Sequence, residues 1–178
     1  YIDDFGMSKT GPLTVGPSTV HSNYKVVKNK DNMSWIVGPN VDLTGADFSG
    51  CDLSGVDLTN SILIDTVFNQ TITGPLLAHS NQTLPNGYNF VNNYIIGINV
   101  VLNGADLSGV VFPQLSVLDG INFSGTDLTG ANFSNVDLQG TRWDGIKSNV
   151  DITIDGDTIL PNGYVRENGF LYGDNLDY

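Results

Sequence analysis

The apolar residues of this chain recur at every fifth position in two separate stretches. In the first stretch, Leu or Phe follows two places after a small or β-branched residue. The four pairs are Val41 and Leu43, Ala46 and Phe48, Cys51 and Leu53, and Val56 and Leu58. An Asp lies inside every pair, and Ser or Thr with Gly or Asn follows it. A period of five fits neither an α-helix nor a simple strand, and a fixed period of this kind is typical of a solenoid.

The second stretch repeats the pattern with one extra residue. The step from Phe112 to Leu118 is six residues long and contains Pro113, so we expect the corner there to bulge outward. The five-residue spacing then continues to Trp143. We expect the inward-facing core of both arrays to consist of Leu43, Phe48, Leu53, Leu58, Leu102, Leu107, Phe112, Leu118, Phe123, Leu128, Phe133, Leu138 and Trp143.

Three units, at residues 46–50, 105–109 and 131–135, resemble the Ala-(Asp/Asn)-Leu-x-x consensus of the pentapeptide-repeat family. The resemblance implies an all-β fold, a right-handed quadrilateral β-helix with one pentapeptide on each side of a coil. It also implies that the central Leu or Phe and the small residue point inward. The Asp or Asn between them would then face solvent.

Segments rich in aromatic and β-branched residues separate the arrays and predict three β-hairpins, at residues 24–38, 84–97 and 160–173. The second and third begin with Leu-Pro-Asn-Gly-Tyr. We expect residues 1–23 to be the tail of a preceding module. Residues 24–83 hold a hairpin, the first array (41–70) and an irregular tail. Residues 84–159 hold a hairpin, the second array (100–145) and a tail, and residues 160–178 hold a third hairpin and the start of a further module.

The hairpins have a predicted role as caps, because a bare solenoid end exposes unpaired strand edges and its apolar core. We expect Trp35 and Ile36 to cover the first array. The residues expected to cover the second array are Tyr88, Phe90, Tyr94 and Ile96.

The charge balance narrows the classes of partner. Nineteen acidic residues against seven Lys and Arg give a net charge of −12. This argues against binding to nucleic-acid phosphates or to anionic membrane surfaces, which need basic clusters. We expect outward Asp residues to keep the solenoid soluble and to protect its edges. No apolar stretch is long enough to insert into a membrane as a spanning helix.

Candidate chemistry is sparse, and we expect no catalytic, cofactor or metal site and no enzymatic activity. There is no phosphate loop, dinucleotide fingerprint or Cys/His metal spacing, and Cys51 occupies an inward position. His21 and His79 lie in polar loops. Stacked Asp106 and Asp127 are a possible weak cation site. The group of Asp151, Asp155 and Asp157 around Gly156 loosely resembles a calcium loop, but a polar turn is the favoured interpretation.

The combination of Leu-Pro-Asn-Gly-Tyr hairpins with pentapeptide arrays is similar to modules in structural proteins of large algal DNA viruses and in marine microbial surface or fibre proteins. The resemblance implies a non-enzymatic building block of a virion capsid or fibre, or of an extracellular filament or surface layer. Its partners would be copies of itself or capsid and fibre proteins. The sequons at Asn69 and Asn81 are possible glycosylation sites. Because the chain begins with Tyr, we expect it to be processed or part of a longer protein.

An alternative is an acidic DNA mimic that binds a topoisomerase. The arrays resemble pentapeptide-repeat proteins that protect topoisomerases from quinolones, and they share an acidic surface with them. A DNA-like rod needs many uninterrupted coils, whereas residues 71–99 are expected to interrupt this one.

Overall fold

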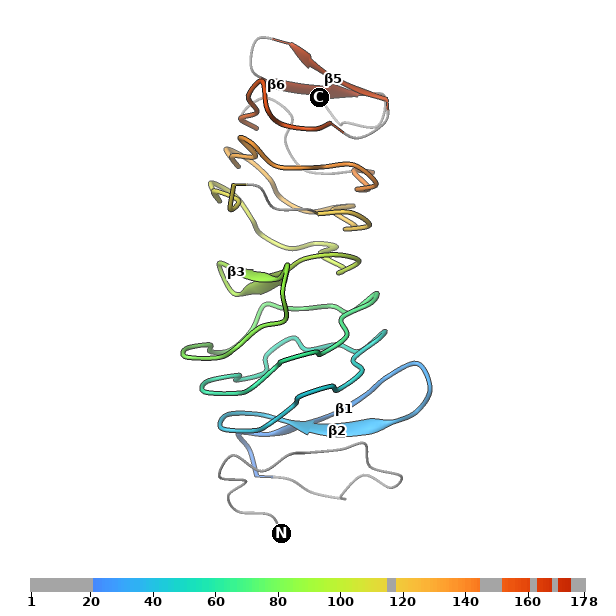
Figure 1. The fold of residues 1–178 in the computed structure, drawn as a ribbon, viewed down its shortest axis with the longest axis vertical. Coiled ribbons are helices and arrows are strands. Elements are labelled where there is room, and N and C mark those ends of the chain that lie inside the picture. Colours follow the sequence, from blue (N-terminus) through green and yellow to red (C-terminus); the bar gives the residue numbers. More distant parts are fainter. Residues whose placement is uncertain (1–20, 115–117, 145–151, 161–162, 168–169, 174–178) are drawn as a thin grey trace. The chain divides into compact units, whose positions relative to one another are not determined.

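The computed structural model describes residues 21–114, 118–144, 152–160, 163–167 and 170–173 (Figure 1). The chain divides into two compact units, Tyr1–Tyr88 and Asn89–Tyr178. The described residues contain no helix, and within each unit the ribbon winds into stacked coils. The predicted all-β fold is confirmed.

Three antiparallel hairpins are present where the sequence predicted them. Strand β1 (Lys25–Lys28) pairs with β2 (Ser34–Val37), β3 (Asn89–Val91) with β4 (Tyr94–Ile96), and β5 (Tyr164–Glu167) with β6 (Phe170–Gly173). The longer first loop is ordered by Asn29, whose Oδ1 accepts the amides of Asp31 and Met33 at 3.0 Å each. In the second loop Asn92 adopts a φ of 51°, as a tight hairpin turn requires.

The coils of the first unit pair in parallel with a spacing of 20 or 21 residues. The bridges are Asp42 to Ile62, Asp47 to Val67, Asp52 to Ile72, Asp57 to Ala78 and Ile62 to Thr83. The pairing therefore runs to Thr83, beyond the array predicted for residues 41–70. It continues because Thr71, Thr73 and Leu76 fill buried inward positions, although they depart from the consensus.

The second unit contains the predicted extra residue. Its first coil pairs with the second at a spacing of 21, through Val101 with Asn122, Asp106 with Asp127, and Val111 with Asn132. The next step, from Asn122 to Arg142, is 20 residues. The longer step confirms the insertion after Phe112; residues 115–117, which contain part of it, lie outside the described residues. A further coil pairs through Asn132 with Thr153 and Asp137 with Ile159.

The solenoid interior is filled by the central residue of each pentapeptide. All thirteen residues expected in the core are at most 2% exposed. Leu63 and Phe68 occupy the same position in the second coil of the first unit and are 0% exposed, so the core continues beyond Leu58.

Candidate interaction surface

The outward Asp of each repeat shapes the corner that follows it. Oδ1 of Asp42 accepts the amide of Thr44 at 2.9 Å, and Oδ1 of Asp47 accepts the amide of Ser49 at 2.8 Å. Oδ1 of Asp52 and Oδ1 of Asp57 likewise accept the amide of the residue two positions later. In the second unit Asn122 replaces Asp and accepts the amide of Ser124 at 2.9 Å. The corner therefore requires an acceptor oxygen rather than a charge, which is the property of an Asx-turn.

Each corner also places one residue in the left-handed region. In the first corner the amide of Ala46 donates to the carbonyl of Leu43 at 2.9 Å, and Gly45 has a φ of 73°. Gly45 is the third residue of this four-residue turn. This position favours Gly or Asn, because other residues are strained at a positive φ. Gln70 takes this position in the second coil with a φ of 56°, and it departs there from the preference for Gly or Asn.

A column of aromatic rings runs through the first unit. Trp35 of β2 lies 5.7 Å from Phe48, Phe48 lies 6.1 Å from Phe68, and Phe68 lies 5.2 Å from Tyr88, measured between ring centroids. Trp35 therefore covers the first coil, as expected. Tyr88 was expected to cover the second array, but it packs on the aromatic column of the first array. Tyr88 follows Phe68 by one coil length, so it continues the column. Its expected role as a cover of the second array stays a prediction.

The second unit ends in the same way. Trp143 packs on Phe123 and Phe133, and Tyr164 lies 6.1 Å beyond Trp143. Tyr88 and Tyr164 are the final residues of the two Leu-Pro-Asn-Gly-Tyr motifs. This motif therefore places an aromatic cap on the array that precedes it. Of the other residues expected to cover the second array, Tyr94 and Ile96 are buried and Phe90 is half-buried.

Hairpin β1–β2 is fastened to the first coil by two lysines. The amide of Lys30 donates to the carbonyl of Ser49 at 3.0 Å. The Lys25 ammonium donates to the carbonyls of Asp52 and Ser54 at 3.0 Å each. Partial burial alone would raise the pKa of Asp52, but hydrogen bonds from Ser54 and the charge of Lys25 outweigh it and hold that pKa below its usual value.

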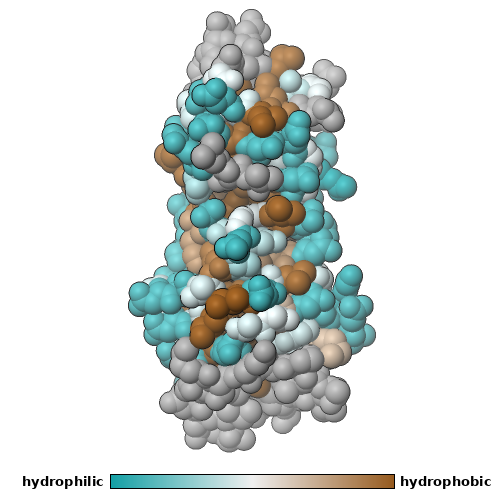
Figure 2. Space-filling model, in the orientation of Figure 1, coloured by the Kyte–Doolittle hydropathy of each residue, from teal (hydrophilic) through white to brown (hydrophobic). Residues whose placement is uncertain are grey.

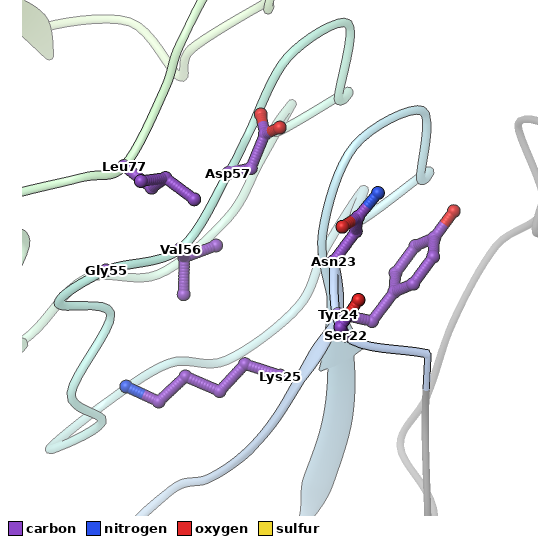
Figure 3. A pocket seen from close by; sticks show the side chains of 8 residues that line it. All are labelled: Ser22, Asn23, Tyr24, Lys25, Gly55, Val56, Asp57 and Leu77. Carbon is purple, nitrogen blue, oxygen red and sulfur yellow. The ribbon is translucent and has the colours of Figure 1, made fainter.

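A small hollow lies beside this hairpin (Figure 3). Its volume is about 90 Å³, and its walls are residues 22–25 on one side and residues 55–57 on the other, with Leu77 at the rim. Substrate pockets usually enclose about 300–1,000 Å³. The hollow is therefore better suited to a single side chain of a protein partner than to a small-molecule substrate.

The Asp residues considered as cation ligands accept hydrogen bonds within corner turns. Asp106 and Asp127 do stack one coil apart, and each Oδ1 accepts both the amide and the hydroxyl of the Ser or Thr two residues onward. Asp155 accepts the amides of Asn135 and Asp157, and the Asn135 bond is the main cause that lowers its pKa. Asp151 lies outside the described residues. The part of the chain that the structure describes holds no group of three His, Cys, Asp or Glu side chains suited to a metal ion.

Cys51 is an interior residue. It is 1% exposed, and burial, with a smaller effect of the charges of Asp47 and Asp52, raises the pKa of its thiol to about 12. The thiol therefore stays protonated and is a poor nucleophile. His79 is half-buried, and Nδ1 of His21 accepts the amide of Asn23 at 3.4 Å.

The two predicted glycosylation sites differ in their surroundings. Asn69 is exposed, but the hydroxyl of Thr71 in the same sequon is buried and donates to the carbonyl of Phe48 at 2.7 Å. Nδ2 of Asn81 donates to Oδ1 of Asn60 at 3.3 Å, so this side chain belongs to a ladder of corner amides. Glycosylation of either residue stays a prediction.

The exposed apolar side chains are dispersed. Among the residues whose burial the structure describes, the largest exposed fractions belong to Leu77 (73%), Val111 (70%) and Val165 (61%). On the face in Figure 2, apolar residues are separated by hydrophilic ones. No helix among the described residues is long and apolar enough to cross a membrane.

Residues 40–72 and 116–142 match the family described as pentapeptide repeats, in eight copies. No curated protein matches the chain. Among solved structures, the chain is similar to the pentapeptide-repeat protein Rfr23 from the cyanobacterium Cyanothece 51142, at 27% identity over 67% of this chain and 60% of that chain, with a TM-score of 0.27. It therefore spans less than two thirds of that relative.

Two further solved structures show weaker likeness. HetL, a pentapeptide-repeat protein involved in heterocyst differentiation regulation in the cyanobacterium Nostoc sp. strain PCC 7120, is 21% identical over 74% of this chain and 70% of that chain, with a TM-score of 0.25. QnrB1, a plasmid-mediated fluoroquinolone resistance protein, is 18% identical over 66% of this chain and 61% of that chain, with a TM-score of 0.20. The identification rests on the two matched arrays and on their corner and core pattern. Residues 40–72 and 116–142 of this chain are pentapeptide repeats, and these repeats form right-handed quadrilateral β-helical arrays.

Proposed function

We propose that this chain is a non-enzymatic building block that acts through contacts with other protein subunits. The observation that carries the proposal is the repeated plan of the chain. In each unit a hairpin is followed by a short array, and a Tyr ring packs at the end of that array. A plan of this kind builds length and surface from similar parts. The outward carboxylates that could serve chemistry accept hydrogen bonds at the corners.

The proposed setting is a virion capsid or fibre, or an extracellular filament or surface layer. The partners in such a setting are copies of this chain or capsid and fibre proteins. The modular organisation of hairpins and arrays supports this setting.

The experiment that tests the proposal is sedimentation of the purified full chain over a range of concentrations, alone and with the proteins that copurify from the native source. We expect species heavier than the 19.1 kDa protomer. Intact-mass analysis of native material would additionally reveal glycans on Asn69 or Asn81. A protomer that stays monomeric and copurifies with no structural protein would contradict the proposal.

The DNA-mimic alternative gains support only from the net charge of −12 and the outward Asp residues. Each array has only two or three coils, which at strand spacing amounts to about 10–15 Å of rod. Hairpin β3–β4 separates the two arrays along the chain. Inhibition of DNA supercoiling by gyrase at near-stoichiometric amounts of the chain would favour the alternative over the building-block proposal.

A further inference from the structure

The dipeptide Asn-Gly occurs four times in the sequence, and two of the pairs, Asn86-Gly87 and Asn103-Gly104, lie wholly within the described residues. Asn followed by Gly is prone to spontaneous deamidation, because Gly has no side chain to hinder attack by its amide nitrogen. Both Asn side chains are exposed. Neither Gly amide donates a backbone hydrogen bond to another described residue, so both nitrogens are available to react.

Both pairs form the middle of a type II turn. The amide of Tyr88 donates to the carbonyl of Pro85 at 3.2 Å, and the amide of Ala105 donates to the carbonyl of Leu102 at 2.9 Å. In each turn the Gly has a positive φ and the Asn before it does not, which is the type II pattern. The Asn backbone is extended in such a turn, so a rotation about its Cα–C bond must precede ring closure on the next nitrogen. Deamidation therefore requires the turn to open.

The turn at Asn103 is held by the next coil on both of its sides. Leu102 donates its amide to the carbonyl of Asn122 at 3.0 Å, and the carbonyl of Ala105 accepts the amide of Asp127 at 2.8 Å. Opening this turn strains these two bonds and breaks the one that closes it.

The turn at Asn86 lacks this support. Residues 84–87 take part in only one backbone hydrogen bond with described residues, the 3.2 Å bond that closes the turn. Among the described residues, the last parallel bridge of the first unit lies at Thr83, and the next paired residue along the chain is Asn89 of β3. Because fewer bonds hold this turn, it opens more often than the turn at Asn103.

The turn at Asn86 also positions the cap of the first array. Tyr88 is the last residue of the turn, and its half-buried ring lies 5.2 Å from the ring of Phe68, measured between centroids. The packed ring keeps the turn closed. Access of the Gly87 nitrogen to Asn86 is therefore coupled to release of the ring from the array.

We propose that Asn86 is a site of spontaneous deamidation and isomerisation that releases the Tyr88 cap from the first array. The amide nitrogen of Gly87 loses its proton and attacks Cγ of Asn86, which closes a succinimide ring. The Cγ–Nδ2 bond breaks, and ammonia leaves with that proton. Water then opens the ring: attack at Cγ gives Asp, whereas attack at the backbone carbonyl carbon gives isoaspartate, in which the main chain runs through Cγ.

The isoaspartyl product changes the turn itself. Its main chain is one carbon longer between Pro85 and Tyr88, so the hydrogen bond of the turn cannot close as before and the ring is displaced from Phe68. The reaction consumes only water, so its extent increases with the age of the molecule. It goes beyond the proposed function and does not depend on assembly of the chain.

The test is incubation of the purified full chain in mildly alkaline buffer, followed by peptide mapping with mass spectrometry at successive times. We expect Asn86 to deamidate at least about fivefold faster than Asn103, since each hydrogen bond that holds a turn closed lowers the open fraction by about that factor. In urea that unfolds the chain, the two sites should react at similar rates. An equal or faster reaction at Asn103 in the folded chain would overturn the inference.

A matched pair of variants tests the coupling to the cap. Tyr88→Ala removes the ring and should accelerate deamidation of Asn86 about threefold, the effect of one lost aromatic contact, while the rate at Asn103 stays unchanged. Tyr88→Phe keeps the ring contact and should leave both rates as they are. An unchanged rate at Asn86 in Tyr88→Ala would overturn the coupling.

The isoaspartyl protein, separated by chromatography, tests the release of the cap directly. We expect it to lose amide-exchange protection around Phe68. Asn86→Asp adds the charge without lengthening the main chain and should keep that protection. Asn86→Gln should resist modification, because its longer side chain has to close a six-membered ring. Full protection around Phe68 in the isoaspartyl protein would show that the modification leaves the cap in place, against the proposal.

Discussion

At the scale of single residues, the corners of the coils depend on an acceptor oxygen at the outward position. Asp47 uses Oδ1 to accept the amide of Ser49, and Asn132 does the same for Ser134, both at 2.8 Å. The outward Asp was expected to serve solubility and edge protection. Its bond to the backbone adds a conformational role, which the recurrence of Ser or Thr two residues after Asp could have indicated.

Replacement of Asp47 by Ala should lower the free energy of unfolding by about 1 kcal/mol, because the amide of Ser49 loses its partner. Asp47→Asn retains an acceptor and should cost less than about 0.5 kcal/mol. Urea denaturation followed by circular dichroism measures both differences. An equal loss in the two variants would mean that the charge, rather than the corner bond, is what stabilises the coil.

The lowered pKa of Asp52 predicts a dependence of stability on pH. Because this pKa is lower in the folded chain than in the unfolded one, the carboxylate stabilises the fold fully above the unfolded value of about 3.9. The contribution is lost as the pH falls through the folded pKa. The urea midpoint should therefore drop below about pH 4, and Asp52→Asn should make that drop smaller. A variant with the same acid-induced drop as the unaltered chain would contradict a role for Asp52.

At the scale of elements, the Leu-Pro-Asn-Gly-Tyr motif ends an array and begins a hairpin. The amide of Tyr88 donates to the carbonyl of Pro85 at 3.2 Å, and Gly87 has a φ of 84°, so the motif makes a turn that brings the ring back over the core. The ring then packs on Phe68. Burial raises the pKa of the Tyr88 phenol, consistent with a ring that covers apolar neighbours.

Tyr88→Ala should lower the free energy of unfolding of the first unit by about 2 kcal/mol, since the half-buried ring covers Phe68. Tyr88→Phe keeps the ring contact and serves as the control, with an expected loss below about 1 kcal/mol. Amide exchange around Phe68 should accelerate in the Ala variant. Unchanged exchange there would show that another element caps the first array.

The hairpins and the inward residues could be predicted from the sequence, because period and turn residues are local signals. Phe48 and Leu128 follow the consensus, and both are buried. The continuation of the first array could not be predicted in this way. Thr73 takes a buried position that elsewhere holds Leu or Phe, and Gln70 takes a corner position that favours Gly or Asn, so both break the pattern. The contact of Tyr88 with Phe68 was not predicted, because sequence order suggests that a hairpin residue caps the array after it.

At the scale of the whole molecule, the chain forms two units, and each contains an aromatic column. Trp35 belongs to the column of the first unit, and Trp143 belongs to that of the second. In a solenoid each coil is stabilised mainly by its nearest neighbours, so damage in one array does not need to spread to the other. These are the only two Trp residues of the chain, so each unit carries its own fluorescent reporter.

Leu128→Asp should unfold the second unit and leave the first one folded. Leu128 is 0% exposed, and an unpaired carboxylate in that position costs several kcal/mol, comparable with the whole stability of about 5–10 kcal/mol expected for a unit of this size. In single-Trp variants, emission from Trp143 should shift to the red while emission from Trp35 stays unchanged. Asn103→Asp adds the same charge at an exposed corner of the second unit and should shift neither. If both Trp signals changed together in Leu128→Asp, the two units would fold as one cooperative body; if neither changed, the inward position of Leu128 would be wrong.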